Sequence, residues 1–240
     1  MFFKGINHYG DLGLILDFGS DSSQQISQEV NAVYALLQDL DLPQLNIVPS
    51  FNKIVLAFQN SKDRNQAQDA IEHNLAKTNL TNSQKDRKIW NIPACYEDSY
   101  ALDRELIQAT RGLNKEEVIS KHTGTSYYAY YIGFMPGFPY LGDIDPSLIT
   151  PRLATPRIQI PARSIGIAKE HTCVYPKVSP GGWNIIGQVP FDIFSLEHSR
   201  TSLFLPGDTV QFQSISEKEF LQIQSKHLAF DESSRSFQSE

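Results

Sequence analysis

Arginines and paired glycines within residues 131–194 are the residue types in this chain best suited to binding an anion. Arg152 and Arg157 each follow a proline, which stiffens the backbone before the guanidinium and lowers the entropy lost when that side chain is fixed. A guanidinium binds carboxylate or phosphate groups in a bidentate manner. Successive backbone amides at Gly181 and Gly182 could also point at one anion. These residues predict a site for a small anion.

The spacing of the two arginines predicts that they have different roles. Arg152 and Arg157 are five positions apart, and an odd separation along an extended strand sends side chains to opposite faces. We therefore expect one arginine at the site and the other in a structural ion pair, and keep both as candidate catalytic residues. The segment ending in Trp183 has two interpretations: an anion-binding turn, or a tight turn in which Trp183 closes one end of a barrel.

A loop rich in glycine, proline and aromatic residues runs from Phe134 to Tyr140. The rings of Phe134, Phe138 and Tyr140 could wall a concave pocket, because small-molecule pockets are mostly apolar with a few polar groups. Pro136 and Gly137 would shape the loop, since proline fixes φ and glycine allows positive φ. The alternative is a barrel corner whose rings belong to the core. We favour the pocket and predict that these residues bind substrate.

His122 is the histidine nearest to this loop along the chain, and it is a candidate for proton transfer. The alternative is a capping or surface residue. The histidines form neither a His-x-His nor a His-Glu-x-x-His pattern, so the sequence predicts no metal site. Cys95 and Cys173 have no metal-ligand spacing and are predicted to be buried free thiols. Without a nucleophile elbow or a phosphate-binding loop, the sequence shows no self-sufficient catalytic set.

The composition excludes several classes of protein. Apolar residues make up 40% and charged residues 20% of the 240 residues, which is typical of a globular chain. The formal net charge of -6 argues against a dedicated nucleic-acid binder, which needs a basic surface. No apolar run approaches the roughly 20 residues of a membrane span, and a charge and a glycine interrupt the start before a signal-peptide core could form. We therefore expect a cytoplasmic protein without a membrane or nucleic-acid partner.

Residues 1–85 are expected to form an α+β domain. The pattern predicts the order strand, strand, helix, strand, strand, helix, and the helices are marked by apolar stripes over 26–40 and 63–77. Because each helix has one apolar stripe, the economical arrangement is a single sheet with both helices on the same face. This half has neither a phosphate loop nor paired carboxylates, so we predict a scaffolding or partner-binding role.

Residues 86–226 are expected to be mostly β-structure. A strand and two short helices come first, and short strands then recur at intervals of roughly 8–12 residues between glycine and proline turns, which is typical of a β-barrel or sandwich. The predicted strands include one over 192–196, and a closing helix is predicted over 217–226. The tail, 227–240, is rich in serine and charge and is predicted to be disordered.

The second half also contains long ordered motifs. They are Gly133-Phe134-Met135-Pro136-Gly137-Phe138-Pro139-Tyr140-Leu141, Thr150-Pro151-Arg152-Leu153-Ala154-Thr155-Pro156-Arg157, Ile160-Pro161-Ala162, Tyr175-Pro176 and Pro180-Gly181-Gly182-Trp183-Asn184-Ile185-Ile186-Gly187. Together they resemble the allophanate hydrolase subunit 1 family, which includes KipI-type kinase inhibitors and the B-type subunits of bacterial 5-oxoprolinase complexes. The likeness extends more weakly over the first half. It implies a ferredoxin-like N-terminal domain and a cyclophilin-like β-barrel C-terminal domain.

The resemblance implies the ATP-dependent opening of 5-oxoproline, a cyclic amide, to L-glutamate. It also implies two partners, a homologous C-type subunit that resembles allophanate hydrolase subunit 2, and a separate A-type subunit. Because the sequence shows no phosphate loop, we expect the ATP site to be shared with a partner or to lie wholly on it. Two alternatives stay open. One is a KipI-type protein that inhibits a sensor histidine kinase, and the other is a subunit of an allophanate- or urea-related amidohydrolase or carboxyltransferase.

The family motifs add Pro161, Tyr175 and Trp183 to the predicted substrate-binding residues. Opening an amide requires stabilisation of its carbonyl oxygen, so the Gly181-Gly182 amides would face an oxyanion. The two arginines would bind the substrate carboxylate or a phosphate, and the histidine would move a proton.

One position departs from the family pattern. Members usually have glycine after the Pro-Ala pair, and here the residue is Arg163. If this position needs positive φ, an arginine is strained there, and a third cation lies near the predicted site.

Overall fold

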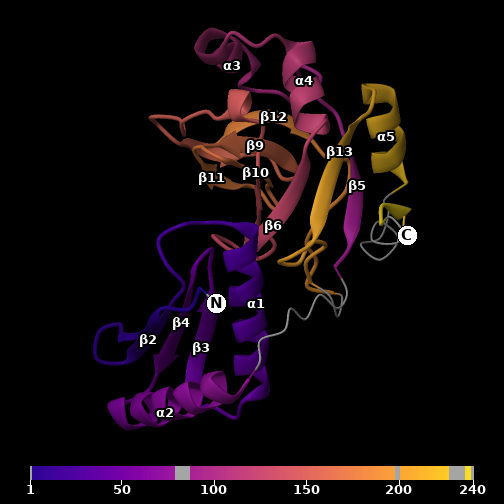
Figure 1. The fold of residues 1–240 in the computed structure, drawn as a ribbon. Helices are drawn as coiled ribbons and strands as arrows, with labels where there is room; N and C mark the ends of the chain where they lie inside the picture. Colours follow the sequence, from indigo (N-terminus) through magenta and orange to yellow (C-terminus); the bar gives the residue numbers. More distant parts are fainter. Residues whose placement is uncertain (1, 79–86, 198–200, 227–235, 239–240) are drawn as a thin grey trace. The chain divides into compact units, whose positions relative to one another are not determined.

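The computed structural model describes residues 2–78, 87–197, 201–226 and 236–238 (Figure 1). The chain divides into two compact units, Met1–Asp86 and Arg87–Glu240. Each unit contains a hydrophobic core cluster of its own. Within the described ranges, no helix is long and apolar enough to cross a membrane.

The first unit is a four-stranded antiparallel sheet with two helices. Its strands pair in the order β1-β2-β4-β3. The predicted order of strands and helices in this half is confirmed. The elements are β1 (Gly5–His8), β2 (Gly13–Asp17), α1 (Gln24–Asp39), β3 (Gln44–Pro49), β4 (Lys53–Phe58) and α2 (Ser61–Lys77).

Both helices of this unit cover the same face of its sheet. Leu14 and Leu16 on β2 and Leu56 on β4 are fully buried, whereas the residues between them along each strand are more exposed. Val30 of α1 and Ile71 of α2 belong to the same core cluster as these leucines. A core on one side of the sheet places both helices there, as the single apolar stripes predict.

The second unit is built on a seven-stranded mixed sheet and a separate two-stranded ribbon. The sheet order is β12-β9-β10-β7-β6-β13-β5, and the ribbon pairs β11 with β8. The strands are β5 (Ile89–Ala94), β6 (Ser126–Ile132), β7 (Pro139–Gly142), β8 (Arg157–Ile160), β9 (Ser164–Ala168), β10 (His171–Val174), β11 (Ser179–Gly181), β12 (Asn184–Gln188) and β13 (Thr209–Ser214). The helices are α3 (Arg104–Arg111), α4 (Lys115–Thr123) and α5 (Glu217–Ser225), with a 3-10 turn at Pro146–Leu148.

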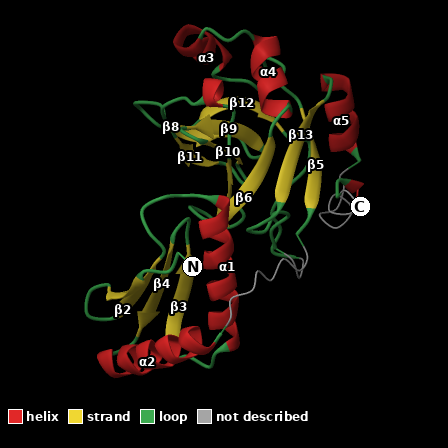
Figure 2. Cartoon of the chain, viewed as in Figure 1, coloured by secondary structure: helices red, strands yellow, loops and turns green. Residues whose placement is uncertain are grey.

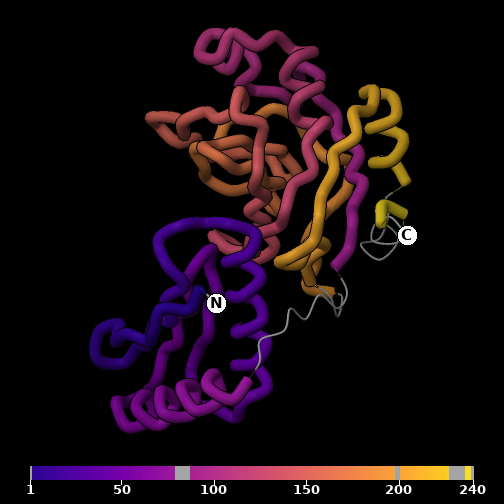
Figure 3. Tube along the Cα trace, in the orientation of Figure 1, coloured from indigo at the N-terminus to yellow at the C-terminus, as the bar shows by residue number. Residues whose placement is uncertain are grey.

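The seven-stranded sheet curls until its two edge strands meet. Cys95, which follows β5, and Gln188 of β12 exchange backbone hydrogen bonds of 2.9 Å. β5 and β13 pair in parallel although they are far apart in sequence, and their traces run side by side in Figure 3. The mainly β character predicted for this half is confirmed, with the sheet curled into a partial barrel.

The helices of the second unit lie on the outside of this sheet, with α3 and α4 close together and α5 beside β5 (Figure 2). α3 ends where Gly112 takes a left-handed φ of 69°. A capping box formed by Asn114 and Glu117 begins α4. Both helix boundaries agree with the sequence. On α5, the buried ring of Phe220 lies 4.6 Å, between ring centroids, from Tyr100.

Three strand assignments differ from the prediction. β7 begins at Pro139 and β11 contains Pro180, and both fall in segments predicted as loops or turns. Proline cannot donate a hydrogen bond to a neighbouring strand, so it obscures a strand in the sequence pattern. The strand predicted over 192–196 is wrong, because an isolated bridge between Phe194 and Ser202 forms there instead.

Part of the predicted disordered tail lies against the second unit. Phe237 stacks on Phe191 with ring centroids 4.8 Å apart. Its backbone oxygen accepts a hydrogen bond of 2.8 Å from Asn91 N on β5. These contacts are at odds with disorder over 236–238, and the rest of the predicted tail lies outside the described residues.

Candidate functional site

The aromatic residues predicted to bind substrate form one cluster in the second unit. Phe138 meets the rings of Tyr140, Tyr175 and Trp183 edge-on, with ring centroids 5.1 Å, 5.2 Å and 5.7 Å away. Phe134 extends this aromatic cluster, with its centroid 5.3 Å from that of Phe138. Phe138 and Tyr175 are 1% exposed and Phe134 is 64% exposed. Burial assigns the inner rings to the core, so the part of the cluster able to meet a ligand is its rim.

The loop that precedes β7 is shaped by two residues with positive φ. Gly137 has a φ of 79°, and a Cβ added to it would lie 2.5 Å from Cβ of Phe194. Only glycine meets both conditions without strain. Phe134 has a φ of 68° although it is not glycine. A hydrogen bond of 3.0 Å from Gly133 N to the oxygen of Phe138 closes the loop, and Phe134 within it is largely exposed.

The guanidinium of Arg152 lies against Gly182. Asn184 Nδ2 donates to the oxygen of Pro151 at 2.8 Å, and Leu153 N donates to the oxygen of Gly182 at 2.7 Å. These bonds fix the backbone on both sides of the arginine. A Cβ on Gly182 would lie 3.5 Å from both Nε and Nη2 of Arg152. The structure therefore brings an exposed cation and the glycine pair together.

The hydroxyl of Tyr175 lies beside the other glycine of the pair. A Cβ on Gly181 would be 2.4 Å from that oxygen, so a larger residue would displace the ring. Burial raises the pKa of Tyr175, while the positive charge of Arg152 acts in the opposite direction. The phenol therefore stays protonated and neutral. Arg152 is thus the exposed polar group at the edge of the aromatic cluster, while Tyr175 and the glycine pair lie buried behind it.

Arg157 has a structural role. Its Nη1 and Nη2 donate to Oδ2 and Oδ1 of Asp103 at 2.8 Å and 2.6 Å. Asp103 is 4% exposed and also accepts a hydrogen bond of 2.6 Å from Ile185 N. The hydrogen bonds that Arg157 donates to the Asp103 carboxylate raise the pKa of Arg157. This is the ion pair expected for one of the two arginines, and it argues against the predicted catalytic role of Arg157.

His122 is a core residue, and its surroundings argue against the predicted role in proton transfer. Its side chain is fully buried, with Nδ1 2.8 Å from the hydroxyl of Tyr96 and Nε2 3.0 Å from Oγ1 of Thr172. Burial lowers the pKa of His122 to about 3, so the imidazole is neutral near neutral pH. A buried imidazole with both ring nitrogens engaged has no free nitrogen to offer a substrate.

Another histidine, His171, lies next to the aromatic cluster. Its ring centroid is 6.3 Å from that of Tyr140. Burial lowers the pKa of His171. Sequence reasoning passed over it because it stands apart from the motifs. Of the remaining predicted residues, Pro136 and Pro161 are both exposed, and Pro161 begins the turn that leads into β9.

Two residues that sequence reasoning did not single out hold the arginines in place. Asp103 holds Arg157, and because the two are 54 positions apart, no local spacing could reveal the pair. Asn184 holds the backbone before Arg152. It is fully buried and is followed by two isoleucines, so a polar residue at the start of a buried strand was the signal in the sequence.

Arg163 has a φ of 68°, so the strain expected for an arginine at this position is present. Its guanidinium contacts Pro190 and Asp192. The third cation expected near the site instead lies in a pocket that shares no lining residue with the aromatic cluster.

The site therefore offers the exposed guanidinium of Arg152 beside the exposed rim of the aromatic cluster, an arrangement suited to binding a small carboxylate. Within the part of the chain that the structure describes, no group of three or more His, Cys, Asp or Glu residues is placed to hold a metal ion. The two other predicted catalytic groups, His122 and Arg157, are engaged within the fold.

Comparison with known proteins shows the family to which this chain belongs. The family described as carboxyltransferase domain, subdomain C and D, matches residues 4–204. A protein from Bacillus subtilis (strain 168), named as the B subunit of 5-oxoprolinase, is 32% identical over 227 residues, which covers 90% of this chain and 94% of that protein. A protein of the same name from Escherichia coli O157:H7 is 34% identical over 183 residues, which covers 75% of this chain and 83% of that protein. The resemblance inferred from the motifs is confirmed.

A solved structure shows the same fold. The crystal structure of TTHA0988 superposes with a TM-score of 0.73 at 29% sequence identity. The match covers 85% of this chain and 40% of that one, so this chain spans less than half the length of that solved protein.

Proposed function

Because the chain belongs to the carboxyltransferase domain family, subdomain C and D, we propose that it is a non-autonomous subunit of a 5-oxoprolinase complex. The observation that carries this proposal is the 32% identity to a protein named as the B subunit of 5-oxoprolinase, over 90% of this chain and 94% of that relative. The complex opens 5-oxoproline to L-glutamate with hydrolysis of ATP. Its other members are a homologous C-type subunit and a separate A-type subunit.

In this proposal, Arg152 binds an anionic group of the substrate at the polar edge of the aromatic cluster. 5-Oxoproline is a small ring bearing a carboxylate, which suits an exposed guanidinium beside an exposed aromatic rim. The buried hydroxyl of Tyr175 and the backbone at Gly182 support the guanidinium from behind. The role of this chain is therefore to hold the substrate while partner groups complete the reaction.

ATP does not fit the described residues of this site by themselves. A triphosphate is usually held by several cations or by a glycine-rich run of amides at a helix N-terminus. At the aromatic cluster, Arg157 is neutralised by Asp103, and the pair Gly181-Gly182 leads into a strand. We therefore place the ATP site on one of the partner proteins.

The direct test is co-expression of this chain with partners of the A and C types, followed by an assay of ATP-dependent glutamate release from 5-oxoproline. Turnover should require all three chains. Arg152→Ala should lower kcat/KM by about 10- to 100-fold, because a charge-assisted contact contributes about 1.5–3 kcal/mol. Arg111→Ala, which removes an exposed arginine at the end of α3, is the matched control and should leave turnover unchanged. Equal turnover in a mixture without this chain would refute the proposal.

A further inference from the structure

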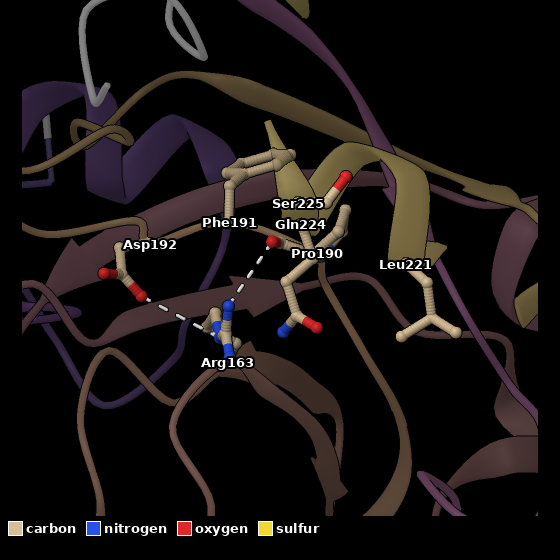
Figure 4. A pocket seen from close by; sticks show the side chains of 7 residues that line it. All are labelled: Arg163, Pro190, Phe191, Asp192, Leu221, Gln224 and Ser225. Atoms are coloured by element: carbon tan, nitrogen blue, oxygen red, sulfur yellow. Dashed lines mark hydrogen bonds and ion pairs between the residues drawn. The ribbon is translucent and has the colours of Figure 1, made fainter. Parts of the chain in front are cut away.

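A second cationic pocket lies in the second unit and shares no lining residue with the aromatic cluster. Its volume is about 670 Å³, within the range of small-molecule sites. Figure 4 shows its walls: Arg163 and residues 190–192 on one side, and Leu221, Gln224 and Ser225 of α5 on the other. We call it the Arg163 pocket.

The charge of Arg163 is incompletely neutralised by its neighbours. Nη1 donates to the backbone oxygen of Pro190 at 3.3 Å. When the amide of Gln224 is turned so that its oxygen faces the guanidinium, that oxygen accepts from Nη1 and Nη2 at 3.2 Å and 3.0 Å. Both acceptors are uncharged. The carboxylate of Asp192 is 3.8 Å from Nε and is 70% exposed, and Nε has no hydrogen-bond partner in the described part of the chain.

The backbone at Arg163 is held in a conformation that favours glycine. Its φ is 68°, and the amide and carbonyl are fixed by bonds of 2.6 Å to the oxygen of Tyr175 and 3.0 Å from Val189 N. An arginine at such a position has a conformational cost that glycine avoids. Residues kept in strained conformations are concentrated at ligand and active sites. The strain therefore points to a use for this side chain.

We propose that the Arg163 pocket binds a small organic carboxylate. The oxygen of Gln224 occupies the position on the two Nη groups that a carboxylate takes in a bidentate pair. A carboxylate there replaces a neutral acceptor by a charged one and forms stronger hydrogen bonds. Phe191 and Leu221 line the same pocket, and the 50% exposed side chain of Leu221 provides an apolar surface for the carbon skeleton. Inorganic phosphate lacks that skeleton and gains nothing from this surface.

Calorimetric titration of the full-length chain tests the proposal, with L-glutamate, 5-oxoproline and inorganic phosphate as probes, and with Arg152→Ala as the background in every variant so that the cation at the aromatic cluster is absent. We expect saturable binding of at least one of the two carboxylates, and weaker binding of phosphate. Arg163→Gly should weaken carboxylate binding by at least about tenfold, and Arg163→Lys by less, because lysine keeps the charge but not the planar fork. Arg111→Ala on α3 is the control and should bind as the Arg152→Ala background does.

A second variant separates ligand binding from a merely structural role of Arg163 in holding α5. Gln224→Glu places a carboxylate of the chain itself on the guanidinium, so it should abolish binding of the added carboxylate while raising the melting temperature of the free protein. The proposal is overturned if neither carboxylate binds at up to about 50 mM. It is also overturned if phosphate binds as tightly as both carboxylates, or if Gln224→Glu binds them with the affinity of the Arg152→Ala background.

Discussion

The bidentate pair between Arg157 and Asp103 shields a carboxylate that is 4% exposed. Without the guanidinium, this buried charge would keep the amide of Ile185 as a donor but lose its counterion. Arg157→Ala should therefore lower the free energy of unfolding by about 2–4 kcal/mol. Arg157→Lys should cost less, because the ammonium keeps the charge but not the two parallel hydrogen bonds. Urea unfolding at neutral pH measures both losses.

Arg152→Ala is the matched control, because Arg152 also follows a proline but is exposed. Its free energy of unfolding should stay within about 0.5 kcal/mol of the wild type. Equal losses of stability in the two alanine variants would contradict the division of the arginines into one binding and one structural residue.

His122 makes stability depend on pH. Burial lowers its pKa from 6.5 to about 3, so between these values the unfolded state binds a proton that the folded state does not. The free energy of unfolding should therefore fall as the pH falls through this window, with a contribution of about 1.4 kcal/mol per pH unit. His122→Gln should flatten the slope by that amount in urea unfolding followed between about pH 6 and about pH 4. His73→Gln, on the exposed face of α2, should keep the wild-type slope.

The depth of His122 in the fold was not predicted, for a physical reason. Nearness along the chain placed it beside the aromatic loop, but chain distance says nothing about depth in the fold. His122 stands four positions after Val118 on α4, and both side chains are buried on the same face of the helix. Because Val118 and His122 are four positions apart on α4, the helical periodicity of buried positions would have placed this histidine in the core.

The turn at Gly137 fixes the conformation of the loop from Phe134 to Tyr140. Gly137→Ala should lower the free energy of unfolding by about 3 kcal/mol or more, because a methyl group there meets Phe194 at 2.5 Å in addition to the strain of a φ of 79°. Gly112→Ala should cost about 1 kcal/mol, since its φ of 69° is similar but nothing lies within 4 Å. Thermal unfolding of both variants compares them. A similar cost at the two positions would show that the contact with Phe194 does not restrain the loop.

Elements with a regular apolar period were predictable, and elements defined by long-range pairing were not. The stripes of α1 and α2 and the capping box of α4 are local, so the sequence shows them directly. β11 has no alternating pattern, because its three residues include a proline and a glycine. The bonds between Cys95 and Gln188 that join the edges of the curled sheet connect backbone groups, which leave no trace in residue type.

At the scale of the whole molecule, we propose that the chain consists of a ferredoxin-like domain over 1–85 and a cyclophilin-like barrel domain over 86–226. The first unit supports this, since its core cluster draws on its own sheet and its own two helices. A domain with such a core has the means to fold alone.

The fragment Met1–Asp86 should therefore unfold cooperatively in urea when expressed by itself. Both tryptophans, Trp90 and Trp183, lie outside this fragment, so far-UV circular dichroism is the suitable measurement. Leu56→Ala should lower its free energy of unfolding by about 2–5 kcal/mol, because Leu56 is fully buried on β4. Leu45→Ala on β3, where the side chain is 67% exposed, should change it by less than about 1 kcal/mol. A gradual transition, or equal effects of the two substitutions, would show that this core does not form without the rest of the chain.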